Sequence, residues 1–247
     1  MTEIYLSDNH LLLQSGYENP EMHSHSACHI LISLCDEMQI ILDKEKVTCR
    51  GALIPSSMKH TVRNFNLPLL VFLFDSTTTV SEQIQTFQLL DNETVHRIVL
   101  AYETYHSGGS LQKDYPNYLS YVMAQLGLKA IGSTITDERI ISAMQFVDEH
   151  IADNIGIEDA AKAAFLSVSR FSHLFKQQAG ITFAGYVVLR KLYHTYVALS
   201  KGTSITDAAL SAGFSSPAHF ASVNKKTFGI TARDICGDFR LHKIAEI

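Results

Sequence analysis

A duplication in the last third of the chain constrains its fold more than any other feature of the sequence. Residues 157–182 read IEDAAKAAFLSVSRFSHLFKQQAGIT, and residues 205–231 read ITDAALSAGFSSPAHFASVNKKTFGIT. The two copies share identical residues at an offset of 48 and then, after the second copy gains one residue, at an offset of 49. The identical pairs are Asp159/Asp207, Ala160/Ala208, Ala161/Ala209, Ala164/Ala212, Ser167/Ser215, Phe171/Phe220, Lys176/Lys225, Gly180/Gly229, Ile181/Ile230 and Thr182/Thr231. Identities at this density indicate one structural unit that occurs twice.

Each copy is predicted to form two short helices joined by a tight turn. The turn occupies residues 165–166 in the first copy and residues 213–214 in the second. A serine follows, Ser167 or Ser215, and is expected to cap the next helix through its hydroxyl. This arrangement is a helix-turn-helix, whose second helix enters the major groove of DNA.

Residues 183–200 lie between the two copies and carry an apolar stripe. As one helix, these 18 residues would be ~27 Å long at ~1.5 Å per residue. That length is of the order needed to hold two recognition helices ~34 Å apart, which is one turn of DNA. The spacing therefore indicates two DNA-reading units on one connecting helix.

Three stretches within residues 140–235 resemble the DNA-binding domain of AraC/XylS-type transcription regulators. They are S-V-S-R-F-S-H-L-F-K followed by Gly180, the connecting helix over residues 186–199, and A-L-S-A-G-F-S-S-P-A-H-F followed by Lys225, Lys226 and Gly229. The A-x-x-x-G-F-S-S stretch is among the most specific motifs of that family. The resemblance implies sequence-specific binding to double-stranded DNA, contact with RNA polymerase, and activation more often than repression.

The resemblance also implies which side chains face DNA. In the first copy, base contacts fall on Ser169, Ser172 and His173, with Arg170 and Lys176 beside them for phosphates. The matching face of the second copy is small and neutral, so it is expected to contribute shape and methyl contacts more than hydrogen bonds. The first copy is therefore expected to carry more of the sequence specificity. The candidate DNA-binding residues are Ser167, Ser169, Arg170, Ser172, His173, Lys176, Lys191, Ser215, Ser216, Pro217, Ala218, His219, Ala221, Ser222, Lys225 and Lys226.

Three positions depart from the pattern of that family. Asn224 stands where Phe usually precedes Lys, which is expected to weaken the apolar anchor of the second recognition helix. In the connecting helix, Lys191 replaces the usual Arg and Thr195 the usual Ala.

Charge is distributed unevenly along the chain. The net charge of −5 by itself argues against a nucleic-acid partner. Residues 1–136, however, carry 8 Lys+Arg against 14 Asp+Glu, residues 137–159 carry one against seven, and residues 160–247 carry eleven against four. The basic last segment suits a polyanion. The acidic segment is expected to face away from the phosphates, toward the N-terminal domain or RNA polymerase.

The first 75 residues contain short apolar runs about ten residues apart, which is typical of short strands in an antiparallel sandwich or barrel. From Ser81 the spacing becomes helical, first at Ile84, Phe87 and Leu90 and then in two further stripes on either side of residues Gly108-Gly109. The apolar runs are 11–13, 30–32, 40–42, 52–54 and 69–74, and the stripes are Val95, Ile98, Val99 and Tyr102, then Leu119, Val122, Met123 and Leu126.

These patterns predict an α+β multidomain protein in three parts. Residues 1–80 form an effector-binding domain, residues 81–132 a helical dimerisation and linker segment, and residues 137–247 an all-α domain with two helix-turn-helix motifs. The helices of residues 81–132 are predicted to make the contact of a homodimer, and packing on their own N-terminal domain is the alternative. A dimer would offer up to four DNA-reading units, so that individually weak modules suffice.

The N-terminal part contains four candidate ligand residues, His23, His25, His29 and His60. Imidazoles two apart on a strand point to the same face, so His23 and His25 can converge. A third imidazole from a neighbouring strand completes a ligand set for Zn²⁺, Ni²⁺, Cu²⁺ or Fe²⁺.

The two stretches H-x-H-x-x-x-H and P-x-x-x-x-H-x-x-x-N, the second over residues 55–64, resemble the paired motifs of cupins, which are small jelly-roll β-barrels. His29 stands where a cupin usually has Glu, and Ser57 where it usually has Gly. The resemblance implies a cupin-like barrel as the sensor. The histidines then line a pocket for an organic effector or are structural, bind a divalent metal, or catalyse a reaction. Cys28 is either a thiol ligand or redox site, or a buried inert side chain.

Several classes of protein are excluded. A hydrophobic content of 46% and a small net charge exclude a disordered chain. No apolar run approaches the ~20 residues of a membrane span, the N-terminus lacks the pattern of a secretory signal, and four irregularly spaced cysteines do not suit a disulfide framework. We therefore predict a cytoplasmic, non-enzymatic transcription regulator that responds to a small molecule or a metal. The alternative is a metal-dependent cupin enzyme with a helical tail that binds a partner.

Overall fold

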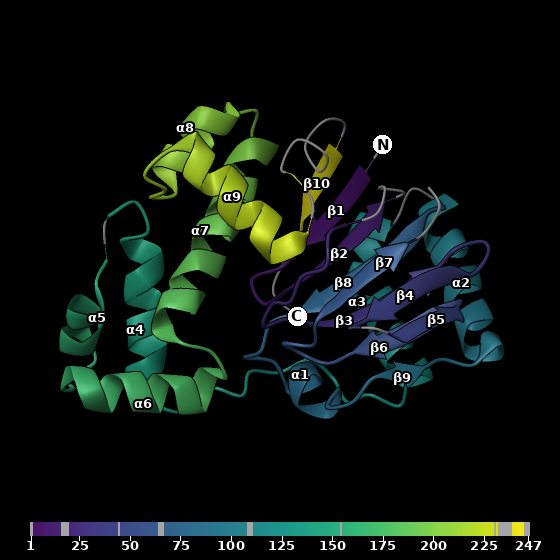
Figure 1. Ribbon diagram of the computed structural model, residues 1–247, viewed down its shortest axis with the longest axis horizontal. Coiled ribbons are helices and arrows are strands. Elements are labelled where there is room, and N and C mark those ends of the chain that lie inside the picture. The colour runs from purple at the N-terminus through teal and green to yellow at the C-terminus, as the bar shows by residue number, and fades with distance from the viewer. Residues whose placement is uncertain are drawn as a thin grey trace. The chain divides into compact units, whose positions relative to one another are not determined.

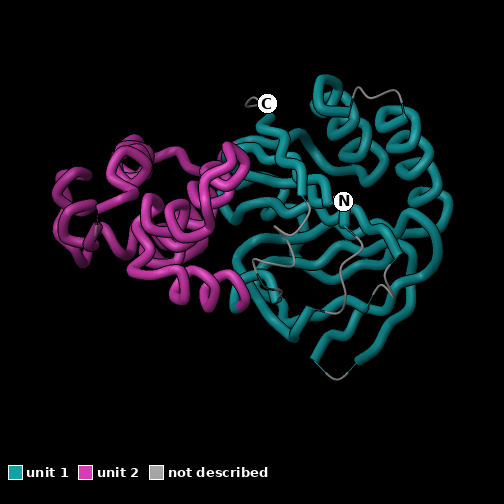
Figure 2. The backbone as a smooth tube through the Cα atoms, turned by 90° about the horizontal axis from the view of Figure 1, so that it is seen from above, with its two compact units in different colours: residues 1–132, 226–247 teal, residues 133–225 magenta. Residues whose placement is uncertain are grey.

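The computed structural model describes residues 2–15, 20–43, 45–63, 67–107, 111–153, 155–229, 231 and 239–244. The chain divides into two compact units, which Figure 2 colours separately. Unit 1 comprises residues 1–132 and 226–247, and unit 2 comprises residues 133–225. Within the described ranges, no helix combines the length and the apolar character that crossing a membrane would require.

Two sheets form the framework of unit 1 (Figure 1). The seven-stranded sheet has the order β10-β1-β2-β8-β3-β6-β9, and the three-stranded sheet has the order β5-β4-β7. The strands are β1 Thr2–Leu6, β2 His10–Ser15, β3 Cys28–Ser33, β4 Met38–Leu42, β5 Glu45–Cys49, β6 Gly51–Ile54, β7 His60–Arg63, β8 Leu69–Phe74, β9 Gln88–Leu89 and β10 Phe239–Lys243. All five apolar runs lie in strands, and β3 and β8 are buried along their whole length.

Three helices of unit 1 follow the first eight strands. They are α1 Thr79–Gln83, α2 Asn92–Ser107 and α3 Leu111–Gln125. The predicted stripes of α2 and α3 are buried in one core with residues of the seven-stranded sheet, such as Leu12 and Phe72. The stripes therefore pack within unit 1. Packing on the N-terminal domain was the stated alternative to a dimer contact. The predicted break at Gly108-Gly109 lies outside the described residues.

The helical spacing at residues 84–90 was misleading. Helix α1 ends at Gln83, Ile84 is buried, and β9 then pairs with β6 at the edge of the seven-stranded sheet. The backbone N–H of Leu90 also donates to the carbonyl oxygen of Gly51 at 3.0 Å. The local apolar spacing is compatible with either a helix or a strand. Pairing with β6, which lies far away in the sequence, has selected the strand.

The prediction of an all-α domain over residues 137–247 is wrong at its end. Residues 239–243 form β10, which pairs in parallel with β1 at the edge of the larger sheet. The ladder continues beyond the strand, because the N–H of Ile244 donates to the carbonyl oxygen of Leu6 at 2.9 Å. Ile244 is buried in the core of unit 1. The described C-terminal residues therefore belong to the N-terminal sheet.

Unit 2 is helical, as predicted. Its helices are α4 Glu138–Glu149, α5 Ile157–Ala163, α6 Val168–Ala179, α7 Phe183–Ser200 and α8 Ile205–Ser211, and α9 Pro217–Phe228 begins in it. The repeat is visible in the bounds, since α8 begins 48 residues after α5 and α9 begins 49 residues after α6. The alanines shared by the two copies are buried, which lets the short first helices pack closely. A β-rich N-terminal domain followed by a helical helix-turn-helix domain is thus confirmed.

His10 makes the stability of unit 1 depend on pH. Its ring is buried between Phe74 and Tyr115, and burial lowers its pKa to about 4. In the unfolded chain the pKa is ordinary, so below about pH 6.5 the unfolded chain binds the proton more strongly and folding is penalised. Wild type should therefore lose about 2 kcal/mol more than His10→Phe between pH 7.5 and pH 5. Urea unfolding at both pH values checks this. His96→Gln, at an exposed histidine of α2, should behave as wild type, and identical pH profiles of wild type and His10→Phe would contradict it.

Candidate DNA-binding surface and histidine cluster

The first helix-turn-helix consists of α5 and α6. The turn passes through Phe165 with a left-handed φ of +54°. Ser167 caps α6 as predicted, since its Oγ accepts the backbone N–H of Arg170 at 3.4 Å. The buried face of α6 consists of Phe171, Leu174, Phe175 and Ala179. The five predicted contact residues of this helix share the opposite, exposed face, namely Ser169, Arg170, Ser172, His173 and Lys176.

The second helix-turn-helix, α8 and α9, repeats this geometry with one change. Gly213, with φ +78°, occupies the turn position that Phe165 holds in the first copy. Ser216, and not the predicted Ser215, caps α9 by accepting the N–H of His219 at 3.1 Å. Ser215 instead shares a hydrogen bond with Nδ1 of the same histidine at 2.9 Å. The extra residue of the second copy therefore lies in the turn.

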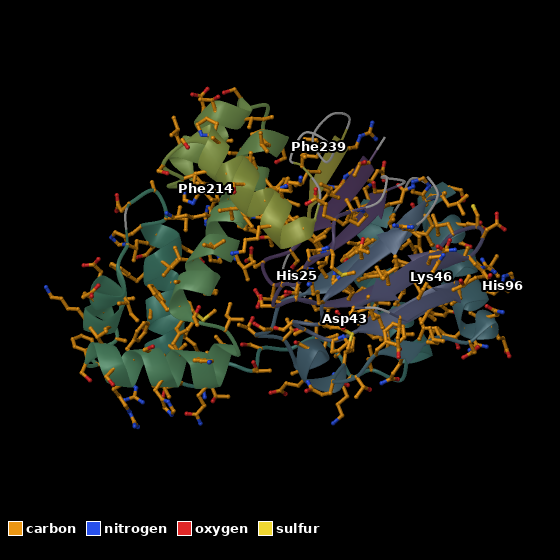
Figure 3. All side chains as sticks on the ribbon, in the orientation of Figure 1. His25, Asp43, Lys46, His96, Phe214 and Phe239 are labelled. Carbon is orange, nitrogen blue, oxygen red and sulfur yellow. The ribbon has the colours of Figure 1, made fainter. Side chains whose placement is uncertain are left out.

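The predicted contact residues of the second copy are exposed or half-buried. Phe214, labelled in Figure 3, packs on Phe220 beneath them with ring centroids 5.4 Å apart. The exposed residues are Ser215, Ala218, His219, Ala221, Ser222, Lys225 and Lys226, and the half-buried ones are Ser216 and Pro217. The two recognition helices thus present equivalent faces of different chemistry, one polar and one made of small side chains.

The connecting helix α7 spans the predicted residues 183–200. Thr182 caps it by accepting the N–H of Gly185 at 3.2 Å. Arg190 ties it to α4, since Nε donates to Oδ1 of Asp148 at 2.6 Å. Burial opposes the ionisation of Asp148, but hydrogen bonds from His194 and Arg190 outweigh burial and lower the pKa. Part of the acidic segment is therefore engaged within unit 2.

The four candidate histidines of unit 1 lie in ring contact with one another. Figure 3 labels one of them, His25. His23 and His60 pair through their backbones, each N–H donating to the other's carbonyl oxygen at 3.0 and 2.9 Å. Ring centroids of His23 and His60, of His25 and His29, and of His29 and His60 are each 4.6 Å apart. His23 and His25 occupy an extended segment before β3, not a strand as predicted. Asn64 of the second cupin-like stretch lies outside the described residues.

Burial keeps these imidazoles neutral. It lowers the pKa of His60 to about 4 and that of His25 to about 3, with the neighbouring histidines adding to the effect for both. Burial also lowers the pKa of His29 and that of His23. At neutral pH each ring therefore has one nitrogen with a free lone pair, which is the form that binds metals.

Cys28 does not belong to this cluster. It neighbours His29 on β3, and successive side chains of a strand point to opposite faces of the sheet. Its thiol is buried, and burial raises its pKa to about 12. A thiol in this environment is a poor nucleophile and a poor metal ligand. The buried, inert alternative for Cys28 is the one that the structure supports.

The Helix-turn-helix domain family matches residues 160–235. Regulatory protein PocR of Salmonella typhimurium is 32% identical over 101 residues, which cover 40% of this chain and only 33% of PocR. The XylDLEGF operon transcriptional activator 2 of Pseudomonas putida is 32% identical over 111 residues, covering 43% of this chain and 67% of that protein. The chain belongs to the AraC/XylS family of transcription regulators.

A likeness in fold extends over nearly the whole chain. The crystal structure of an apo ToxT variant from Vibrio cholerae shares the fold with a TM-score of 0.58, covering 93% of this chain and 97% of that chain. The sequence identity is 12%, so the likeness concerns the fold alone.

One departure from the AraC/XylS pattern stabilises the second turn. Nζ of Lys191 donates to the carbonyl oxygen of Gly213 at 2.6 Å, and burial lowers its pKa. Thr195 back-bonds to the carbonyl oxygen of Lys191 at 2.8 Å. The ammonium that the sequence assigned to DNA thus already has a partner within unit 2.

Asn224 departs from the AraC/XylS pattern without leaving a gap. It is fully buried, and its Oδ1 accepts the hydroxyl of Tyr196 on α7 at 2.6 Å. The equivalent residue of the first copy, Phe175, packs instead on Phe183 and Tyr186. The second recognition helix therefore replaces an apolar anchor with a buried hydrogen bond, which the sequence pattern did not predict.

Proposed function

We propose that the protein is a sequence-specific DNA-binding transcription regulator of the activator type. The observation that carries this proposal is the pair of equivalent helices, α6 and α9, each with one face buried and the opposite face exposed. Recognition helices of helix-turn-helix proteins read base edges with such faces. The segment that follows residue 159 is also the basic part of the chain.

The exposed faces of α6 and α9 make different kinds of contact with DNA. Ser169, Ser172 and His173 read bases by hydrogen bonds, while Ala218 and Ala221 offer methyl and shape contacts. Basic side chains and one histidine beside them bind phosphates, which fix the register without reading sequence. These are Arg170, Lys176, His219, Lys225 and Lys226. Lys191 is left out of this set, because its ammonium binds the carbonyl oxygen of Gly213.

The N-terminal domain is proposed to bind the effector, a small molecule or a metal, and to bias DNA binding. Such control requires that the effector bind one arrangement of the protein better than the other. RNA polymerase and a second copy of the chain are the proposed protein partners. Because the stripes of α2 and α3 are buried, a homodimer would use another surface. Enzymatic activity is not part of this proposal, since the relatives are regulators.

DNA binding tests the proposed site. Wild type should shift a fragment of the DNA upstream of its own reading frame, and Arg170→Ala/Lys176→Ala should bind it at least ~10-fold more weakly. Each lost phosphate contact should also reduce the slope of log affinity against log salt by about 0.9. Fluorescence anisotropy between low and physiological salt measures both quantities.

A matched control removes two exposed lysines elsewhere. Lys113 and Lys129 lie on unit 1 and outside the recognition helices, so Lys113→Ala/Lys129→Ala makes the same change in net charge. This variant should keep the affinity and salt slope of wild type. Equal losses in both double variants, or none in either, would refute the assignment of α6.

A further inference from the structure

The histidine cluster brings two imidazole nitrogens close together. Nε2 of His25 and Nε2 of His29 lie 3.1 Å apart, so that one ring can donate a hydrogen bond to the other or both can bind one ion. The other nitrogen of His29, Nδ1, is buried and has no hydrogen-bond partner among the described residues.

Two further rings are held in one tautomer. Nδ1 of His23 lies 2.8 Å from the carbonyl oxygen of Glu21, and Nδ1 of His60 lies 2.8 Å from the carbonyl oxygen of Met58. A carbonyl only accepts, so each Nδ1 carries the proton and each Nε2 keeps its lone pair. Metal-binding histidines commonly have this arrangement, in which a backbone carbonyl orients the ring.

The lone pairs are close enough to share one ion. One nitrogen from each of His23, His25 and His60 lies within 4.8 Å of the others. Two imidazole nitrogens at ~2.1 Å from one ion are about 3.0–3.4 Å apart at angles of ~90–110°. The separation of 3.1 Å between His25 and His29 already matches that value. For His23 and His60, side-chain rotation can bring the nitrogens from within 4.8 Å to this separation.

We propose that His23, His25, His29 and His60 bind one divalent first-row transition-metal ion, and that this ion is the effector of the N-terminal domain. The second part rests on the proposed function. The donor set consists of imidazoles, without a carboxylate or thiolate, and therefore favours Cu²⁺, Ni²⁺ and Zn²⁺ over Mg²⁺, Ca²⁺ and Mn²⁺. Because the imidazoles are neutral, the bound ion keeps its full charge of about +2 in a buried place, which gives it a large electrostatic influence on its surroundings.

Direct binding tests the site on the full chain stripped with a chelator. Titration with ZnCl₂ and with NiCl₂, followed by calorimetry, should give one ion per chain, and MgCl₂ should give no binding at the same concentrations. His25→Gln and His29→Gln should each weaken binding at least ~10-fold. Co²⁺ should develop visible absorption bands in wild type that both variants lack. His96→Gln, at an exposed histidine, is the control and should bind as wild type.

Circular dichroism shows whether each variant folds. Two single variants are used, so that the site can still be tested if one of them does not fold. Binding that survives in both, or that falls equally in His96→Gln, overturns the site. The anisotropy assay then compares metal-loaded with metal-free protein, and the affinity for DNA should differ by at least ~5-fold. Metal binding without this difference overturns the effector role. If neither the metal-free nor the metal-loaded protein binds DNA, the proposed function is refuted. The metal site is tested separately, because the titrations contain no DNA.

Discussion

Replacing Gly213 by alanine should destabilise unit 2 by ~3 kcal/mol or more and abolish DNA binding by the second helix-turn-helix. Gly213 has φ +78°, which costs an L-residue ~1–2 kcal/mol. Its carbonyl oxygen also accepts the bond from Lys191. A Cβ at this position would collide with the carbonyl oxygen of Ile151, which is backbone and cannot rotate away. The turn is therefore pressed against the chain that follows α4.

Gly202 provides a matched control for this prediction. Its φ is +83°, but nothing lies within 4 Å of a Cβ built there. Gly202→Ala should therefore show only the backbone cost, ~1 kcal/mol. Urea unfolding followed by circular dichroism measures both variants. If Gly213→Ala costs no more than Gly202→Ala, the close approach to Ile151 is not a constraint.

Breaking the buried bond between Tyr196 and Asn224 should have the second large effect. Tyr196→Phe removes the hydroxyl that donates to Oδ1 of Asn224 at 2.6 Å, and should lower the free energy of unfolding by ~1–3 kcal/mol. Asn224→Ala should cost more, because it also leaves a cavity under α9. The second recognition helix should lose affinity for DNA in both variants, since this bond anchors it to α7.

A double-mutant cycle isolates the bond from the cavity. The double variant should be less destabilised than the sum of the single variants by ~1–3 kcal/mol, because the bond can be lost only once. If the effects of the two substitutions on the free energy of unfolding were additive, the hydrogen bond would contribute no stability. Phe175→Ala in the first copy gives the comparison with an apolar anchor, and is expected to cost ~3–5 kcal/mol.

The helix-turn-helix repeat could be predicted because its signals are local. The alanine spacing and the turn recur at an offset of 48 residues. The connecting helix over 183–200 follows from one apolar stripe. Such patterns depend on residues three or four apart, which helical geometry brings together by itself. The exposed face of α6 follows in the same way, because Phe171, Leu174 and Phe175 must be buried.

The misplaced elements all depend on partners distant in the chain. Strand β9 forms because Leu89 pairs with Ala52, and β10 forms because residues 239–243 find β1 at the other end of the sequence. Local pattern is compatible with either choice in these places, and hydrogen bonds to remote segments decide between them.

By itself, the sequence determined that a helix-turn-helix occurs twice, which residues face outward from α6, and that the basic charge lies in the C-terminal part. Periodicity and charge are properties of neighbouring residues, so they can be read along the chain. Only the tertiary structure decided that the stripes of α2 and α3 pack on their own sheet, and that Lys191 and Asn224 have partners inside unit 2. It also decided that four histidines from three segments lie in ring contact. Each of these is a contact between residues far apart in sequence, and folding of the chain is what brings such residues together.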